Sequence, residues 1–227
     1  MRTRLKVCCI ASIEEARLAV AAGVSALGLV AEMPSGPGPI ADALIAEIAA
    51  AVPPPVSRFL LTSRTEAAEI VKHARACRVD TVQLVDAVSI ETYAAIRVVL
   101  PYLRIVQVLH AEGEESIEDA RRVAPHVHAI LLDSGRPSAA VRELGGTGRV
   151  HDWAISRWVV EAASCPVFLA GGLTPANVGA AIERVRPYGL DLCSGIRTGG
   201  RLDGAKLGAL VAAIEAKDTE LFVVRLH

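Results

Sequence analysis

The stretch LKVCCIASIEEARLAVAA, residues 5–22, contains two patterns that recur along the chain. It begins with a short apolar run, residues 5–10, which has the length and composition of a buried strand. It continues with helical spacing over residues 12–22, where Ser12 and Glu15 are spaced as in a capping box. The stretch therefore predicts one strand followed directly by one helix.

The same unit is repeated along the chain. Strand-like apolar runs lie at 5–10, 25–30, 57–62, 80–85, 104–109, 128–132, 166–170 and 189–193. Segments with helical spacing lie at 12–22, 40–51, 64–76, 89–98, 115–123, 152–163, 174–185 and 203–216. Near-continuous apolar strands joined by helices are typical of parallel sheets covered on both faces. Eight such units in about 200 residues predict an α/β protein with a single-domain (β/α)8 TIM barrel fold.

The domain organisation follows from this count. A doubly wound open sheet is the structural alternative, but the first strand-to-helix turn lacks the Gly-x-Gly-x-x-Gly pattern typical of that fold. The proline-rich pieces at 34–39 and 53–55 are too short to be linkers, so we expect one barrel over residues 1–216. Residues 217–227 form a C-terminal extension, expected to pack outside the barrel or against a partner subunit.

The composition and charge of the chain indicate which kinds of partner it binds. The chain has 227 residues, 52% of them hydrophobic, and its formal net charge is -1 with the basic residues scattered, which argues against nucleic acid binding. Its apolar runs are too short for a membrane span. Five cysteines without a Cys-x-x-Cys motif or a signal peptide are typical of a cytoplasmic protein. We expect a small-molecule ligand and a monomer or homodimer.

Polar residues and glycines stand where the predicted strands end, which in barrel enzymes is the catalytic face. The polar candidates are Cys8, Cys9, Thr62, Arg64, Gln83, His110 and Asp133. Glycine-rich segments lie at 145–148, 170–173 and 194–200. Bare backbone amides and helix dipoles after the last strands can approach an anion closely. The pattern predicts a phosphorylated small substrate.

Four pieces of the sequence resemble phosphoribosylanthranilate isomerase, a (β/α)8 enzyme of tryptophan biosynthesis. They are KVCCI at 6–10, GGTGRVHDW at 145–153, LAGGLTPANV at 169–178 and RPYGLDLCSGIR at 186–197. The family usually reads KICGI, GGTG with FDW, LAGGLxPxNV and RPxGVDVSSGVE. The resemblance implies an Amadori rearrangement, in which a phosphoribosyl amine becomes a 1-amino-1-deoxyribulose 5-phosphate without a metal or an organic cofactor.

The resemblance implies that Cys8 is the general base and Asp133 the general acid. Opening the furanose ring requires a proton on the ring oxygen, and the next step requires a base that takes the C2 proton of the iminium. A thiolate can do this where a positive charge or dipole lowers the thiol pKa from about 8.5. Taken alone, a buried hydrophobe is the more common role for such a cysteine, and a turn residue for such an aspartate.

Further contacts are expected around this pair. The expected phosphate-binding residues are Gly146, Gly148, Gly171, Gly172, Ser194 and Gly195. The expected substrate-binding residues are Lys6, Gln83, His110, Asp191 and Arg64. Strand alternation puts Lys6 on the same face as Cys8 and puts Cys9 on the opposite face, between barrel and helices. We expect Cys9, Cys77, Cys165 and Cys193 to have no catalytic role, and we expect no metal site at His126 and His128.

Two departures from the family pattern concern the aglycone end of the substrate. The family usually has SPRYV after the second strand, and its arginine pairs with the anthranilate carboxylate; here the stretch is GPGPI, with Gly38 in the arginine's place. The family's QLHG is QLVD here, so that Val85 replaces a histidine. A bidentate guanidinium is hard to replace, and Arg64 is the candidate substitute for it, whereas His110 is a candidate for the relocated polar contact.

Three functions remain open from the sequence. The first is phosphoribosylanthranilate isomerase activity with a rebuilt carboxylate site. The second is the same chemistry on another phosphoribosyl amine or phosphosugar. The third is a non-catalytic barrel that binds a phosphate metabolite. Retention of Cys8 and Asp133 favours catalysis, since a binding protein has no use for a matched acid and base.

Overall fold

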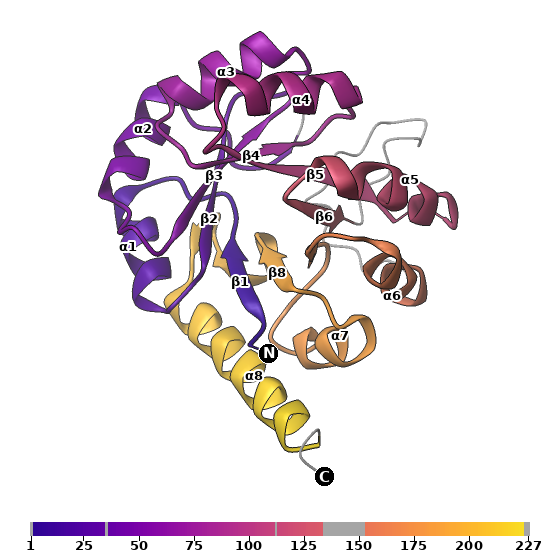
Figure 1. Cartoon of the computed structure of the whole chain (residues 1–227). Helices are drawn as coiled ribbons and strands as arrows, with labels where there is room; N and C mark the ends of the chain where they lie inside the picture. Colours follow the sequence, from indigo (N-terminus) through magenta and orange to yellow (C-terminus); the bar gives the residue numbers. More distant parts are fainter. Residues whose placement is uncertain (1, 35, 112, 134–152, 225–227) are drawn as a thin grey trace.

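The fold is a closed barrel of parallel strands surrounded by helices (Figure 1). The computed structural model describes residues 2–34, 36–111, 113–133 and 153–224. Its strands pair in chain order from β1 to β8, and β8 pairs with β1 to close the sheet. The predicted single-domain (β/α)8 TIM barrel is therefore confirmed.

The elements alternate along the chain as the apolar patterns predict. The barrel strands are β1 Arg4–Val7, β2 Ala26–Val30, β3 Ser57–Thr62, β4 Thr81–Leu84, β5 Arg104–His110, β6 Ala129–Asp133, β7 Val167–Leu169 and β8 Gly189–Leu192. The helices are α1 Ile13–Ala21, α2 Asp42–Ala51, α3 Ala67–Ala76, α4 Ile90–Val99, α5 Glu115–Val123, α6 Trp153–Ala162, α7 Val178–Val185 and α8 Gly204–Val224. Short pieces complete the order: the 3-10 turns η1 Ala124–His126 and η2 Ser194–Ile196, and the small hairpin β9 Arg197–Thr198 with β10 Arg201–Leu202.

Two helices differ from their predicted ranges by more than three residues at one end. Helix α7 begins at Val178 rather than near Thr174, because the carbonyl of Thr174 first closes a turn by accepting from the backbone amides of Asn177 and Val178. Helix α8 does not end at residue 216 but continues to Val224, so the expected extension is largely a continuation of this helix. Figure 1 shows its C-terminal end projecting beyond the barrel.

The apolar residues form two clusters, one on each face of the barrel wall. The larger cluster lies between the strands and the helices and includes Leu29, Leu60, Ile130 and Leu190. The smaller cluster takes the alternate strand positions and includes Phe59, Leu131 and Phe168. The rings of Phe59 and Phe168 meet edge to face, with centroids 6.2 Å apart. The alternation of side chains along each strand thus fills the interior and coats the exterior of the same wall.

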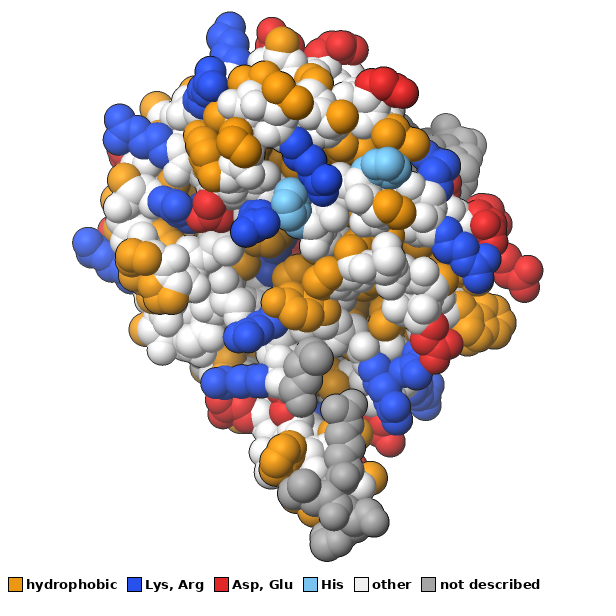
Figure 2. Space-filling view, in the orientation of Figure 1, with side chains coloured by type: hydrophobic (Ala, Val, Ile, Leu, Met, Phe, Trp, Pro, Cys, Tyr) orange, Lys and Arg blue, Asp and Glu red, His pale blue; other side chains and the backbone are white. Residues whose placement is uncertain are grey.

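The surface carries charges of both signs. Figure 2 shows basic and acidic side chains interspersed with apolar ones on the face it presents. Within the described residues, no helix is long and apolar enough to cross a membrane.

Candidate active site

A pocket opens at the C-terminal ends of the barrel strands, and all eight strand ends contribute to its wall. Most of the residues expected to act on a substrate line it together. They are Cys8, Gln83, His110, Asp133, Gly171, Gly172, Asp191, Ser194 and Gly195. The described lining also contains apolar side chains such as Val30, Leu61 and Leu131. Apolar walls with a few convergent polar groups are typical of a small-molecule site.

Cys8 follows β1 and is held over a buried ion pair. Lys6 is fully buried and donates from Nζ to Oδ1 of Asp191 at 2.8 Å, its register neighbour on β8. Burial disfavours the charge on Lys6, but Asp191 and the nearby thiols outweigh that effect and raise the pKa of Lys6. Gly28 on β2 makes room for both groups, since a Cβ there would lie 2.8 Å from Cys8 Sγ and 3.0 Å from Lys6 Nζ. A thiolate at Cys8 therefore has a fixed positive neighbour.

Asp133 ends β6 and faces the same pocket. It is buried, and it is the register neighbour of His110 at the end of β5. Its carbonyl accepts from the backbone amide of Ala111 at 3.1 Å, which anchors the chain where the strand ends. A carboxyl group in a largely apolar wall is suited to carry a proton to a substrate oxygen.

Gln83 points into the pocket from β4. The residue is 4% exposed, and its Oε1 atom is buried without a hydrogen-bond partner among the described residues. An unsatisfied buried acceptor costs free energy. A ligand that donates a hydroxyl or an amine hydrogen at this point would remove that cost.

The glycine turns after β7 and β8 form the opposite part of the wall. Gly171 and Gly172 have φ values of +91° and +62°, in the left-handed region that favours glycine. A Cβ at Gly195 would lie 2.1 Å from the carbonyl oxygen of Leu173. The two turns thus approach each other by backbone alone, as a phosphate site built from amides requires.

The position of Cys9 differs from the expected one. Strand β1 ends at Val7, so strand alternation does not extend to Cys9, and a φ of +61° turns its side chain into the pocket instead of toward the helices. There its Sγ lies 2.7 Å from Sγ of Cys193, which also lines the pocket. The left-handed backbone at Cys9 accounts physically for the glycine of the family pattern.

Arg197 and Glu15 were missed by the reasoning from the sequence. Arg197 donates to the carbonyl oxygens of Cys8 and Cys9 and pairs with Glu15 at 3.0 Å. Burial opposes the charge on Glu15, but hydrogen bonds from Leu202 and Arg197 lower its pKa. The signal that could have found this pair is the arginine that follows SGI, where the family pattern has glutamate.

Four of the expected contact residues are absent from the described pocket lining: Lys6, Arg64, Gly146 and Gly148. Arg64 lies outside the lining and pairs with Glu69 at 3.0 Å. Gly146 and Gly148 lie outside the described residues. The described pocket lining contains no lysine or arginine. Lys6 is fully buried beneath the pocket and does not form part of its wall. The expected replacement of the family arginine by Arg64 therefore finds no support in the geometry.

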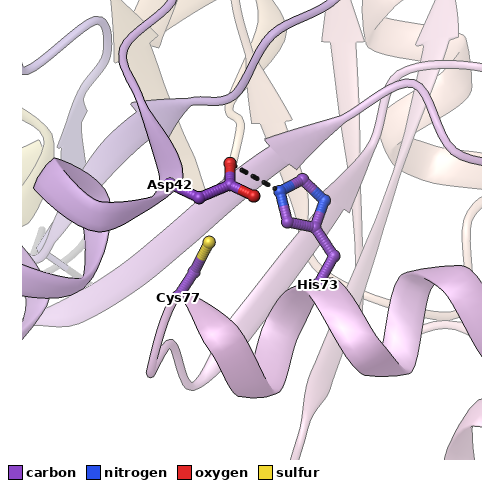
Figure 3. A group of neighbouring side chains, drawn as sticks. All are labelled: Asp42, His73 and Cys77. Atoms are coloured by element: carbon purple, nitrogen blue, oxygen red, sulfur yellow. Dashed lines mark hydrogen bonds and ion pairs between the residues drawn. The ribbon is translucent and has the colours of Figure 1, made fainter.

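One cluster away from the pocket offers metal-ligand atoms. Asp42, His73 and Cys77 bring a carboxylate, an imidazole and a thiol within 4.8 Å of one another (Figure 3). Both ring nitrogens of His73 already have partners, Thr62 Oγ1 at 3.2 Å and Asp42 Oδ1 at 3.1 Å. Burial, followed by the charge of Asp42, raises the pKa of Cys77 to about 12. The two hydrogen bonds of His73 tie α2, α3 and β3 together.

Comparison with known proteins agrees with this geometry. Residues 5–213 match the family described as N-(5'-phosphoribosyl)anthranilate (PRA) isomerase. The chain is 37% identical over 195 residues to N-(5'-phosphoribosyl)anthranilate isomerase 2 of Methanosarcina mazei, covering 86% of this chain and 85% of that protein.

Solved structures give the same result. Phosphoribosyl anthranilate isomerase from Thermus thermophilus superposes with a TM-score of 0.80 at 29% identity, covering 94% of this chain and 99% of that chain. The structure of a phosphoribosyl anthranilate isomerase in complex with reduced 1-(o-carboxyphenylamino)-1-deoxyribulose 5-phosphate superposes with a TM-score of 0.78 at 25% identity. The match covers 94% of this chain and 99% of that chain. The chain therefore belongs to the N-(5'-phosphoribosyl)anthranilate isomerase family.

Proposed function

We propose that this chain isomerises N-(5'-phosphoribosyl)anthranilate, with Cys8 as general base and Asp133 as general acid. One observation carries the proposal. A thiol from the end of β1 and a carboxyl from the end of β6, two strands that are not neighbours, line one pocket with the glycine turns after β7 and β8. An acid and a base set apart across a phosphate-sized anion site are what an aldose-to-ketose rearrangement of a phosphosugar needs.

In this mechanism the phosphate fixes the sugar between the turns at Gly172 and Gly195, which presents the ring to the acid and the base. Asp133 donates a proton to the furanose ring oxygen, the ring opens, and the amine nitrogen forms an iminium. Cys8, which lies close to the buried ammonium group of Lys6, removes the C2 proton as the thiolate. The resulting enolamine tautomerises to the 1-amino-1-deoxyketose. Oε1 of Gln83, which has no hydrogen-bond partner within the described part of the chain, accepts a hydrogen bond from a substrate hydroxyl or from the amine.

The experiment is a direct assay of the purified chain on N-(5'-phosphoribosyl)anthranilate. We expect formation of 1-(o-carboxyphenylamino)-1-deoxyribulose 5-phosphate, at a rate that is unchanged after treatment with a metal chelator, because both proton transfers are assigned to side chains. Absence of product would contradict the proposal, and loss of activity on chelation would contradict the cofactor-independent mechanism.

A second candidate substrate is a phosphoribosyl amine whose aglycone carries no carboxylate. The observation that favours it is the absence of lysine and arginine from the described pocket lining, together with Gly38 in the place of the family arginine. Competition between such an amine and phosphoribosylanthranilate, each assayed for kcat/KM, separates the two candidates.

A further inference from the structure

Two thiols of the pocket wall have no role in the proposed proton transfers. Cys9 and Cys193 are 184 positions apart in the chain, but their Sγ atoms lie 2.7 Å apart and form a hydrogen bond. Cys9 follows β1 and Cys193 follows β8, and both line the pocket from which a small reagent can reach them. A disulfide has its sulfur atoms about 2.05 Å apart, so a bond requires only a small further approach.

The surroundings of the pair favour reaction at Cys193. The hydrogen bond with Cys9 and, against the effect of burial, the charge of Arg197 lower the pKa of Cys193. The same hydrogen bond raises the pKa of Cys9. A thiolate that is accessible and lies next to a second thiol is the arrangement typical of redox-sensitive cysteines.

We propose that Cys9 and Cys193 form a peroxide-reactive dithiol, a modification site in which the oxidant converts the two thiols into a disulfide that joins the end of β1 to the end of β8. The sulfur of Cys193 attacks one oxygen of the peroxide, an S–O bond forms, the O–O bond breaks, and hydroxide leaves and takes up a proton. The sulfur of Cys9 then attacks the sulfenic acid, the S–S bond forms, and the S–O bond breaks with loss of water. Hydrogen peroxide is reduced to two water molecules and the two thiols are oxidised by two electrons.

Oxidation is expected to stop catalysis, and this consequence rests on the proposed function. Cys9 directly follows Cys8, and Cys193 directly precedes Ser194 and Gly195. A covalent link between these two points constrains the base and one phosphate turn at once. Reduction by dithiothreitol restores both thiols and therefore restores activity.

The primary test uses the full, reduced chain and hydrogen peroxide without any substrate. We expect loss of two of the five cysteine thiols, a mass decrease of two hydrogen atoms, and one linked peptide pair that contains Cys193 and the Cys8–Cys9 segment. Treatment with dithiothreitol reverses all three changes. Oxidation of Cys193 to sulfinic or sulfonic acid without a link would overturn the proposal.

Variants identify which cysteine pairs with Cys193. The linked peptide is expected in Cys8→Ser and in the control Cys165→Ser, which changes a thiol remote from the pair. It is expected to be lost in Cys9→Gly, a change that suits the left-handed backbone at this position, and in Cys193→Ala. A link that persists in Cys9→Gly but disappears in Cys8→Ser would assign the disulfide to Cys8 and overturn the proposal.

The activity arm is separate. In the wild type, peroxide is expected to lower the rate on phosphoribosylanthranilate at least tenfold and reversibly, whereas the ratio of treated to untreated rate in Cys9→Gly stays near one. A linked peptide with undiminished activity would overturn the inhibitory consequence. If the reduced wild type has no activity on this substrate, the proposed function fails while the linked peptide still tests the dithiol.

Discussion

Gly195 lines the pocket, whereas Gly38 directly follows the lining residue Pro37, and an added side chain would meet a different obstacle at each glycine. At Gly195, after β8, an added Cβ would lie 2.1 Å from the backbone oxygen of Leu173. At Gly38, in the loop after β2, it would lie 2.8 Å from the side-chain Cβ of Cys9. A backbone obstacle cannot be removed by substitution, but a side chain can. The turn proposed to bind phosphate is therefore constrained by the backbone, whereas the space for a side chain at position 38 depends on which residue occupies position 9.

The largest expected effect is the loss of the proposed general acid, Asp133. Asp133→Asn keeps the shape of the side chain but removes its acidic proton, so we expect kcat on phosphoribosylanthranilate to fall by about 10²- to 10⁴-fold. The control is Asp86→Asn, at the end of β4 but outside the pocket lining. Equal losses in both variants would contradict a specific role for Asp133.

The next largest expected effect is on stability and concerns the buried ion pair between Lys6 and Asp191. Lys6→Met leaves Asp191 buried without its partner, and breaking a buried pair from one side costs about 3–5 kcal/mol. Urea unfolding should show this loss, and Lys6→Met combined with Asp191→Asn should recover part of it because no isolated charge remains. A double variant less stable than Lys6→Met would mean that the charges are not coupled.

At the phosphate end, Gly195→Ala should impair binding. The added methyl group has to displace the backbone at Leu173, and such overpacking costs about 1–3 kcal/mol. We expect a raised KM and a lower unfolding free energy. Gly208→Ala is the matched control, since nothing lies within 4 Å of a Cβ there, in helix α8. An unchanged KM in Gly195→Ala would show that the phosphate does not bind at this turn.

At the aglycone end, the structure revises what Gly38→Arg alone can achieve. Gly38 has a φ of +77° and its Cβ position is blocked by Cys9, so the single change should destabilise the chain without raising activity. Cys9→Gly removes the contact with the Cys9 side chain, although the left-handed φ of residue 38 remains. In the double variant a guanidinium facing the substrate carboxylate adds about 1.5–3 kcal/mol of charge-assisted hydrogen bonding, about a tenfold to hundredfold gain in kcat/KM on phosphoribosylanthranilate.

The test of this comparison is a double-mutant cycle over the single and double variants. Additive effects on stability and activity would show that Cys9 and Gly38 are independent, and the contrast between the two ends of the pocket would not hold.

The fold was predictable because each strand is a continuous apolar run and each helix has apolar residues at helical spacing. Segments such as 57–62 and 115–123 fall on β3 and α5 with the same bounds. Ser12 caps α1 as the spacing predicts, accepting from the backbone amide of Glu15 at 3.2 Å. The end of α8 was missed because its apolar residues, such as Phe222, are exposed there and give no signal of burial.

The pocket was predictable where strand ends decide it and unpredictable where distant residues meet. Cys8, Gln83 and Asp133 were found from their positions at strand ends. The predicted direction of the Cys9 side chain was wrong, because the alternation of side chains along the strand was assumed to continue past Val7. The backbone becomes left-handed at Cys9. Its contact with Cys193 depends on barrel closure, which no local pattern contains.

The proposed mechanism assigns proton abstraction to Cys8 and not to its neighbour Cys9. A comparison of kcat for Cys8→Ser and Cys9→Ser on phosphoribosylanthranilate, under reducing conditions, tests this assignment. We expect Cys8→Ser to lose about 10²- to 10⁴-fold, whereas Cys9→Ser, whose thiol takes no part in proton transfer, should lose far less. An inactive Cys9→Ser beside a nearly unaffected Cys8→Ser would contradict it.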